Sequence, residues 1–177
     1  MDRRVMRTRR AIMEAYVALR RQKVSLTVAL VADQADIGRG TFYLHFKDIQ
    51  DLEDQVLREA ADQVLQRLDQ TPLTARGQAT RDWVASLMLF LRDLAPQLGM
   101  LADTGQGLVL RKQVQAKLEK WLQPTGAVSL DTRGYAAAAI DVAISGLFGD
   151  AGTTDTATIN AWLAGALDRA REGGTKA

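Results

Sequence analysis

The sequence contains no cysteine and a single histidine, His45. This excludes disulfides, thiolate metal sites and multi-histidine zinc sites, so no bound metal is expected. No apolar run approaches the roughly 20 residues that span a bilayer. The longest candidate, Trp83–Leu94, is interrupted by Ser86 and Arg92. The basic N-terminus leads into no apolar signal segment. We therefore expect a cytoplasmic protein with no membrane association.

The residues of common active sites are also scarce. Serine occurs only at positions 25, 86, 129 and 145, no nucleophile–base pair is evident, and no glycine-rich phosphate loop is present. Asp141 lies in an apolar segment, where it caps a helix, pairs with an arginine such as Arg133, or lines a pocket. One carboxylate does not make a catalytic site, so we expect neither an enzyme nor a bound cofactor.

Charge is distributed unevenly along the chain. Residues 1–50 contain ten Lys and Arg against five Asp and Glu, whereas residues 51–177 contain 13 against 16. A basic head on a mildly acidic body suits phosphate contact by the head, although an ordinary solvated surface explains the same numbers. Five arginines crowd the start of the first expected helix: Arg3, Arg4, Arg7, Arg9 and Arg10. Cations there oppose the helix macrodipole, and DNA phosphate would compensate for them.

The spacing of apolar residues predicts an all-α protein. They recur at intervals of three and four, and alternating β-branched runs are absent. We expect a three-helix head of residues 1–50 and a helical body of residues 51–177. Ser25 or Thr27 is available to cap the second helix, and Asp48 the fourth. The longer expected helices are Arg3–Gln22, Asp48–Asp69, Thr74–Ala95, Gly107–Leu122, Asp131–Phe148 and Asp155–Arg171.

Residues 27–47, TVALVADQADIGRGTFYLHFK, have the spacing of a helix-turn-helix, whose second helix enters the major groove of DNA. Ala32 supplies a small residue where the two helices cross. Asp36 occupies the turn position that requires a left-handed backbone. The apolar residues that hold the pair together are Val31, Ala35, Ile37 and Phe42. The outward positions of the second helix are Gly38, Arg39, Gly40, Tyr43 and Leu44.

The outward residues have the chemistry of a DNA contact. Arg39 can reach a guanine edge or a phosphate, and Thr41 and Tyr43 can donate hydroxyl hydrogen bonds to phosphate. Gly40 would allow the backbone to approach DNA closely, but a glycine needed for helix packing is an equal explanation. His45 either packs at the junction with the fourth helix or contacts a base.

The string RGTFYLHFK, with Thr27 ahead of it and a helix behind it, resembles the DNA-binding domain of the TetR family of bacterial repressors. The resemblance covers about residues 8–57, and TRRAIMEAYVAL is similar to the first helix of that family. It implies that Thr27 opens the second helix at a phosphate. It also implies that Tyr43 and the region of Lys47 hold the DNA backbone, while the short third helix recognises bases.

Two positions depart from the family pattern. Asp36 replaces the usual turn glycine, and Ile49 replaces a lysine that often begins the fourth helix, so that Lys47 would supply the missing phosphate contact. The expected DNA-binding residues are Arg7, Thr27, Val28, Gly38, Arg39, Gly40, Thr41, Tyr43, Leu44, His45 and Lys47.

Beyond residue 57 the resemblance concerns layout alone. It implies a helical body that binds a small effector and dimerises through its last two helices. Small residues in both helices permit close packing, so the last two helices of each of two chains would form a four-helix bundle. The two heads of such a dimer would recognise a palindrome. Alternatively, these faces are buried within one chain. The expected dimer contacts are Ala139, Ala143, Leu147, Ile159, Trp162, Leu163 and Ala166.

Methionine and aromatic residues on the middle helices are candidates for an effector pocket, although such a stripe also describes ordinary core. They are Trp83, Met88, Phe90, Met100, Trp121 and Tyr135. The segment Gly99–Gly107 contains three glycines and is either a mobile element that couples ligand to head or an ordinary loop.

The sequence thus predicts a homodimeric repressor that binds a palindromic operator in double-stranded DNA and is released by an unidentified small-molecule effector. The alternative is a DNA-binding protein without such a ligand, either architectural or regulated by another protein. Activation instead of repression fits the same residues.

Overall fold

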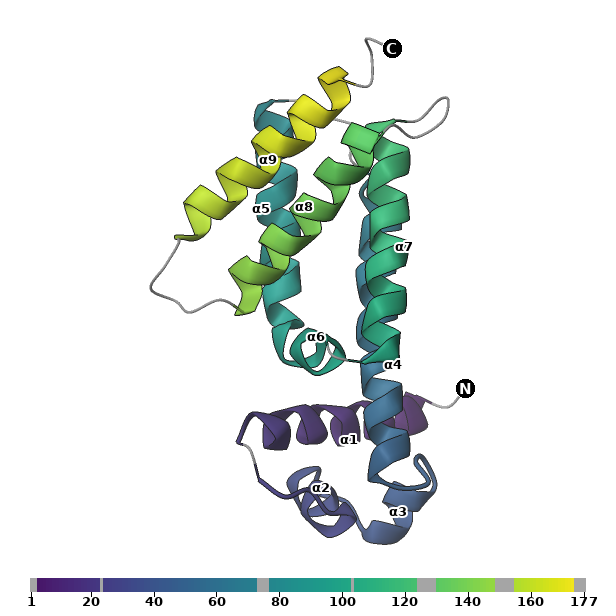
Figure 1. Cartoon of the computed structure of the whole chain (residues 1–177). Coiled ribbons are helices and arrows are strands. Elements are labelled where there is room, and N and C mark those ends of the chain that lie inside the picture. The colour runs from purple at the N-terminus through teal and green to yellow at the C-terminus, as the bar shows by residue number, and fades with distance from the viewer. Residues whose placement is uncertain are drawn as a thin grey trace. The chain divides into compact units, whose positions relative to one another are not determined.

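A computed structural model describes residues 3–22, 24–72, 77–102, 104–123, 130–148 and 155–173. These residues form nine helices and no strand, so the expected all-α class is confirmed. Figure 1 shows the helices in chain order. The chain divides into two compact units, unit 1 (Met1–Ala60) and unit 2 (Ala61–Ala177).

Unit 1 is built around one buried face of its first helix. Its elements are α1 (Arg3–Arg21), α2 (Val28–Gln34), α3 (Arg39–Tyr43) and the first part of α4 (Ile49–Gln70). The largest side chains of its core are Ile12, Tyr16, Phe42, Phe46 and Leu52, each at most 2% exposed. The unit extends ten residues beyond the expected boundary at residue 50, because the first turns of α4 contribute Leu52, Val56 and Ala60 to the buried stripe.

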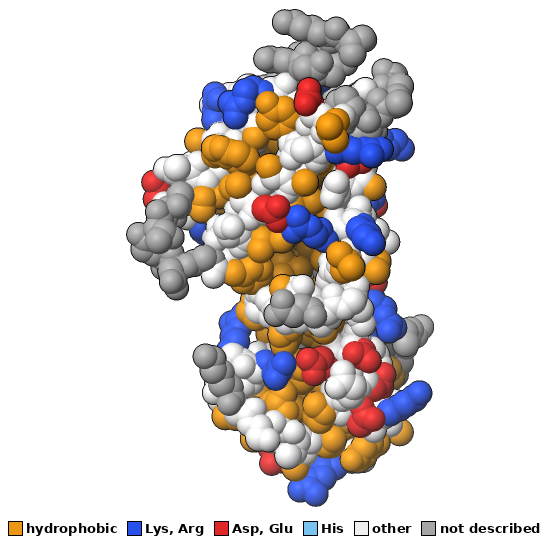
Figure 2. Space-filling view, in the orientation of Figure 1, with side chains coloured by type: hydrophobic (Ala, Val, Ile, Leu, Met, Phe, Trp, Pro, Cys, Tyr) orange, Lys and Arg blue, Asp and Glu red, His pale blue; other side chains and the backbone are white. Residues whose placement is uncertain are grey.

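Unit 2 contains the end of α4 and five further helices: α5 (Gln78–Asp93), α6 (Ala95–Leu101), α7 (Gly105–Leu122), α8 (Leu130–Phe148) and α9 (Thr156–Gly173). The most extensive packing is of α8 on α9, of α9 on α5 and of α8 on α7. The core of the unit forms where these four helices meet. Hydrophobic side chains also remain on the surface over α8 and α9 (Figure 2).

Polar contacts bind the helices of unit 2 to one another. The carboxylate of Asp168 in α9 accepts a hydrogen bond from the buried hydroxyl of Thr80 at 2.8 Å and from the Gly77 N–H at 3.1 Å. It therefore satisfies backbone and side-chain donors at the start of α5. Arg67 of α4 donates to Ser86 at 2.7 Å.

The turn between α6 and α7 depends on Gly107. A Cβ at this position would lie 2.0 Å from the carbonyl oxygen of Leu101, so no larger residue fits without moving the backbone. Thr104 caps α7 by accepting a hydrogen bond from the Gly107 N–H at 3.1 Å. This cap explains why α7 begins at Gly105, two residues before the expected start.

The other helix bounds lie within two residues of the expected ones wherever both ends are described. The expected start of α5 at Thr74 falls outside the described residues, as does most of the connector after Gln123. Among the described residues, no single helix is long and apolar enough to cross a membrane; α5 and α6 meet that test only as a pair, which is bent by 76°.

Gly107→Ala is expected to lower the free energy of unfolding by about 1–3 kcal/mol, because the added methyl group overpacks the turn. Chemical denaturation of the full chain measures this loss. Gly105→Ala is the matched control. No atom lies within 4 Å of a Cβ at Gly105, and alanine favours helix, so its stability stays equal or rises. Equal losses in both variants would contradict the steric explanation.

Candidate functional site

The α2–α3 pair of unit 1 is set by a cap and a left-handed turn. Thr27 has extended backbone, and its hydroxyl accepts a hydrogen bond from the Leu30 N–H at 3.2 Å. Asp36 has a φ of 54° and is the only non-glycine residue with positive φ among those described. The Ile37 N–H then donates to the carbonyl of the fully buried Ala32 at 3.0 Å. The predicted turn conformation at Asp36 is thus confirmed.

The predicted outward positions of α3 are all exposed. Tyr43 is 58% exposed and Leu44 is 83% exposed. The side chain of the preceding residue, Phe42, is fully buried in the core. Gly38 and Gly40 are exposed as well, and a Cβ at either position would meet no atom within 4 Å. Packing within the described chain therefore does not require Gly40 to be a glycine.

The link from α3 to α4 fixes the backbone of Lys47. Its N–H donates to the Asp51 carboxylate at 2.9 Å, and this bond is the main cause that lowers the pKa of Asp51. Asp48 caps α4 by accepting from the Asp51 N–H at 2.8 Å. His45 is half-buried, and its ring centroid lies 6.4 Å from that of Phe46.

The arginines at the start of α1 differ in their partners. Arg9 donates to Gln55 at 2.9 Å and to Glu59 at 3.2 Å, and its guanidinium lies 5.6 Å from the Phe46 ring centroid. The Arg9 guanidinium therefore has its partners within unit 1. Arg7 and Arg39, by contrast, are exposed and form no ion pair with any described residue.

The remaining predicted contacts lie close to these. Thr27 and the side chain of Lys47 are exposed, while Val28 and Thr41 are half-buried. The α2–α3 segment of unit 1 thus carries exposed cationic and hydroxyl groups, those of Arg39, Thr27 and Tyr43. The surrounding backbone is held by the Thr27 cap and the Asp36 turn.

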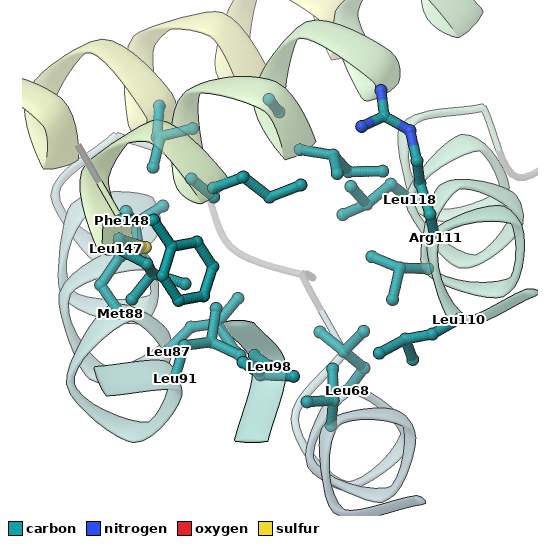
Figure 3. A pocket seen from close by; sticks show the side chains of 18 of the residues that line it. Leu68, Leu87, Met88, Leu91, Leu98, Leu110, Arg111, Leu118, Leu147 and Phe148 are labelled. Atoms are coloured by element: carbon teal, nitrogen blue, oxygen red, sulfur yellow. The ribbon is translucent and has the colours of Figure 1, made fainter. Parts of the chain in front are cut away.

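A separate cavity of about 180 Å³ lies within unit 2. Residues from α4 to α9 line it, and nearly all are aliphatic or aromatic. Figure 3 shows Leu68, Leu98 and Leu118 around the same space, with Arg111 rising from α7 at its edge. Among the described residues of the lining, Arg111 is the only charged one. Trp83 also contributes, but its indole N–H already donates to the Thr71 carbonyl at 2.7 Å.

Arg111 forms an ion pair with Asp141 of α8 at 2.7 Å. The Asp141 carboxylate raises the pKa of the Arg111 guanidinium, and Arg111 in turn lowers the pKa of Asp141. The two side chains are 36% and 61% exposed, and an exposed pair of this kind contributes about 0.2–1 kcal/mol. Asp141 therefore pairs with Arg111 and not with the suggested Arg133.

Two of the six predicted pocket residues, Trp83 and Met88, line this cavity. The other four do not. Phe90 lies against the Arg67 guanidinium, 5.8 Å from ring centroid to Cζ, and Trp121 packs edge-on against Trp83 at 5.8 Å. Tyr135 packs on the core cluster, and Met100 in α6 is also absent from the lining.

Arg111 was missed because the prediction considered only large apolar side chains. Its sequence signal is its position: with Gly107, Val114 and Leu118 it follows helical spacing, so an arginine interrupts an apolar stripe of α7. Leucine, valine and alanine supply most of the remaining lining, which no composition signal distinguishes from ordinary core.

Most of the predicted dimer residues are buried inside unit 2. Ala139, Ile159, Leu163 and Ala166 are at most 8% exposed in a single chain. Ala143 and Leu147 are half-buried and line the cavity. The small residues bring α8 and α9 of the same chain together. Of the seven predicted contacts, Trp162 alone is exposed, at 42%.

No protein-family model and no curated protein matches the chain. Within the described ranges, no group of three or more His, Asp or Glu residues could hold a metal ion. Function therefore has to be inferred from the chemistry of the α2–α3 segment and of the cavity.

Asp36→Val is expected to lower the free energy of unfolding by about 1–2 kcal/mol, because a β-branched side chain tolerates the left-handed backbone poorly. Asp36→Gly is the matched variant, since glycine adopts this conformation without strain and should match or exceed the stability of the natural chain. Denaturant titration of both variants and of the natural chain measures these free energies of unfolding. A valine variant as stable as the glycine variant would show that the φ of Asp36 places no constraint on folding.

Proposed function

We propose that this chain is a TetR-type transcriptional regulator with a helix-turn-helix head and an effector-binding body. In this proposal two copies bind a palindromic operator in double-stranded DNA and act as a repressor that a small molecule releases. The observation that carries the proposal is the α2–α3 segment, whose second helix presents Arg39 and two open glycines beyond a left-handed turn.

Several properties of this segment support DNA binding. Gly38 and Gly40 leave room for a close approach to the α3 backbone. Arg39 is exposed without an ion-pair partner in the described chain, so its guanidinium is available for a guanine edge or a phosphate. The hydroxyl of the exposed Tyr43 can donate to phosphate.

Dimerisation is part of the proposal because two symmetry-related heads recognise a palindrome. The interface we now propose differs from the one expected from the sequence. It uses the outer side of α9, where Ala161, Trp162 and Gly165 share one face by helical spacing. Trp162 is the proposed anchor, since it is partly exposed and tryptophan is enriched among the residues that contribute most to interface energies.

The cavity of unit 2 favours the hypothesis of a small-molecule effector over the alternative of a DNA-binding protein without such a ligand. Its volume of about 180 Å³ exceeds the roughly 150 Å³ of an apolar cavity that holds benzene. Residues of six helices line it, including α6 and α7, which approach closely where Gly107 of α7 lies against the Leu101 carbonyl. A molecule bound there would therefore contact most of the elements of unit 2.

The full chain should protect a palindrome in the DNA upstream of its own gene in a footprint at physiological salt. Arg39→Ala should weaken this specific binding by about 1–3 kcal/mol if Arg39 contacts a base. Arg81→Ala, which removes an exposed arginine of α5, is the control and should leave the footprint unchanged.

Two results would count against this assignment. Absence of any protected palindrome contradicts the proposed function. A uniform loss over all DNA sequences in Arg39→Ala, with a smaller dependence on salt, would instead identify Arg39 as a phosphate contact.

Trp162→Glu should weaken self-association at least tenfold, because it removes the proposed anchor and places a charge in the interface. Sedimentation at micromolar concentration measures the change. Leu89→Glu is the matched control, since Leu89 is 64% exposed on α5 and lies outside the proposed face. A natural chain that is monomeric, or a dimer equally affected by both variants, would refute this interface.

A further inference from the structure

The cavity of unit 2 combines apolar walls with one cationic group. Apart from the Arg111 guanidinium, its lining offers almost only carbon atoms, among them Leu110, Val114 and Leu118 from the same helix. The partner carboxylate of Asp141 does not line the cavity. Among the described lining residues the charged group is therefore the guanidinium, which Figure 3 shows at the edge of the cavity, where the polar end of an occupant would meet it.

The guanidinium has donors to spare. It carries five N–H groups, and the described residues offer it a single partner, Asp141, through Nη1 at 2.7 Å. Its planar fork matches a carboxylate in a bidentate geometry. Because Asp141 is 61% exposed, water can solvate it when a second anion approaches, and it can turn away at small cost.

From these observations we propose that the cavity binds an apolar molecule with one carboxylate, the tail among the leucines and the carboxylate on Arg111. The inference rests on the proposed function in taking the cavity to be a ligand site. A cationic ligand is disfavoured because it would face the guanidinium. A neutral ligand would gain the apolar contacts but neither the ion pair nor the bidentate hydrogen bonds that a carboxylate forms with a guanidinium.

The cavity also limits the size of the tail. A volume of about 180 Å³ suits one aromatic ring or a medium-length alkyl chain, since about 150 Å³ holds benzene. The carboxylate remains at the edge, where Arg111 is partly exposed to solvent. Octanoate and octan-1-ol are therefore suitable probes, because they share a tail length and differ in the charged group.

Calorimetric titration of the full chain with octanoate, below its micellar concentration, tests the inference. Octanoate should bind the natural chain more tightly than octan-1-ol does. Arg111→Gln should weaken octanoate binding about tenfold or more, while the affinity for octan-1-ol changes less than twofold. Asp141→Asn should strengthen octanoate binding, because it removes the competing carboxylate.

Lys112→Gln is the control, since it removes the neighbouring positive charge from an exposed residue outside the lining. It should leave both affinities unchanged. Octan-1-ol binding as tight as octanoate binding, equal octanoate affinity in Arg111→Gln, or no octanoate binding would each overturn the inference. If Arg111→Gln does not fold, the two probes on the natural chain and on Asp141→Asn still decide.

Operator release by the same probes separates this inference from the proposed function. Octanoate that binds through Arg111 without releasing the operator supports the ligand class and contradicts the effector role. Octan-1-ol that releases the operator better than octanoate does has the opposite meaning: it supports the effector role and overturns the ligand class.

Discussion

Close packing of α8 against α9 decides which side chains of unit 2 face inward and which face solvent. The contact depends on small residues: a Cβ at Gly146 would lie 3.0 Å from Ile159, and Ala139 and Ala166 are buried. Ala139 and Ala166 are thus buried within one chain and offer little surface to a second one. The same packing turns Trp162 outward, so intramolecular packing determines what any dimer can use.

The α2–α3 segment of unit 1 depends on a different constraint, the left-handed backbone of Asp36. This turn lets α3 present Arg39 and Tyr43 while Phe42 anchors it in the core. The Arg9 contacts with Gln55 and Glu59 then bind α1 to the first turns of α4 within the same unit. An arginine near a group of candidate DNA contacts thus serves the fold instead.

Local features of this fold could be predicted from the sequence, and features that depend on distant partners could not. The Thr27 cap, the Asp36 turn and the buried stripe of α4 follow from residues within a few positions of one another. The partner of Asp141 was not predictable, because Arg111 lies 30 positions away and only the packing of α7 on α8 brings them together. Periodicity identifies the inward face of a helix but not the helix that covers it.

The same reasoning explains why the cavity was only partly predicted. Large side chains fill space, as the edge-on pair of Trp83 and Trp121 does, and a cavity forms where the available side chains fail to fill it. A search for methionine and aromatic residues therefore finds well-packed walls more readily than the empty space between them. A charged residue within an apolar stripe is the more informative signal, because a charge beside apolar surface needs a partner or access to solvent. Arg111 meets that need at the rim, through Asp141 and solvent.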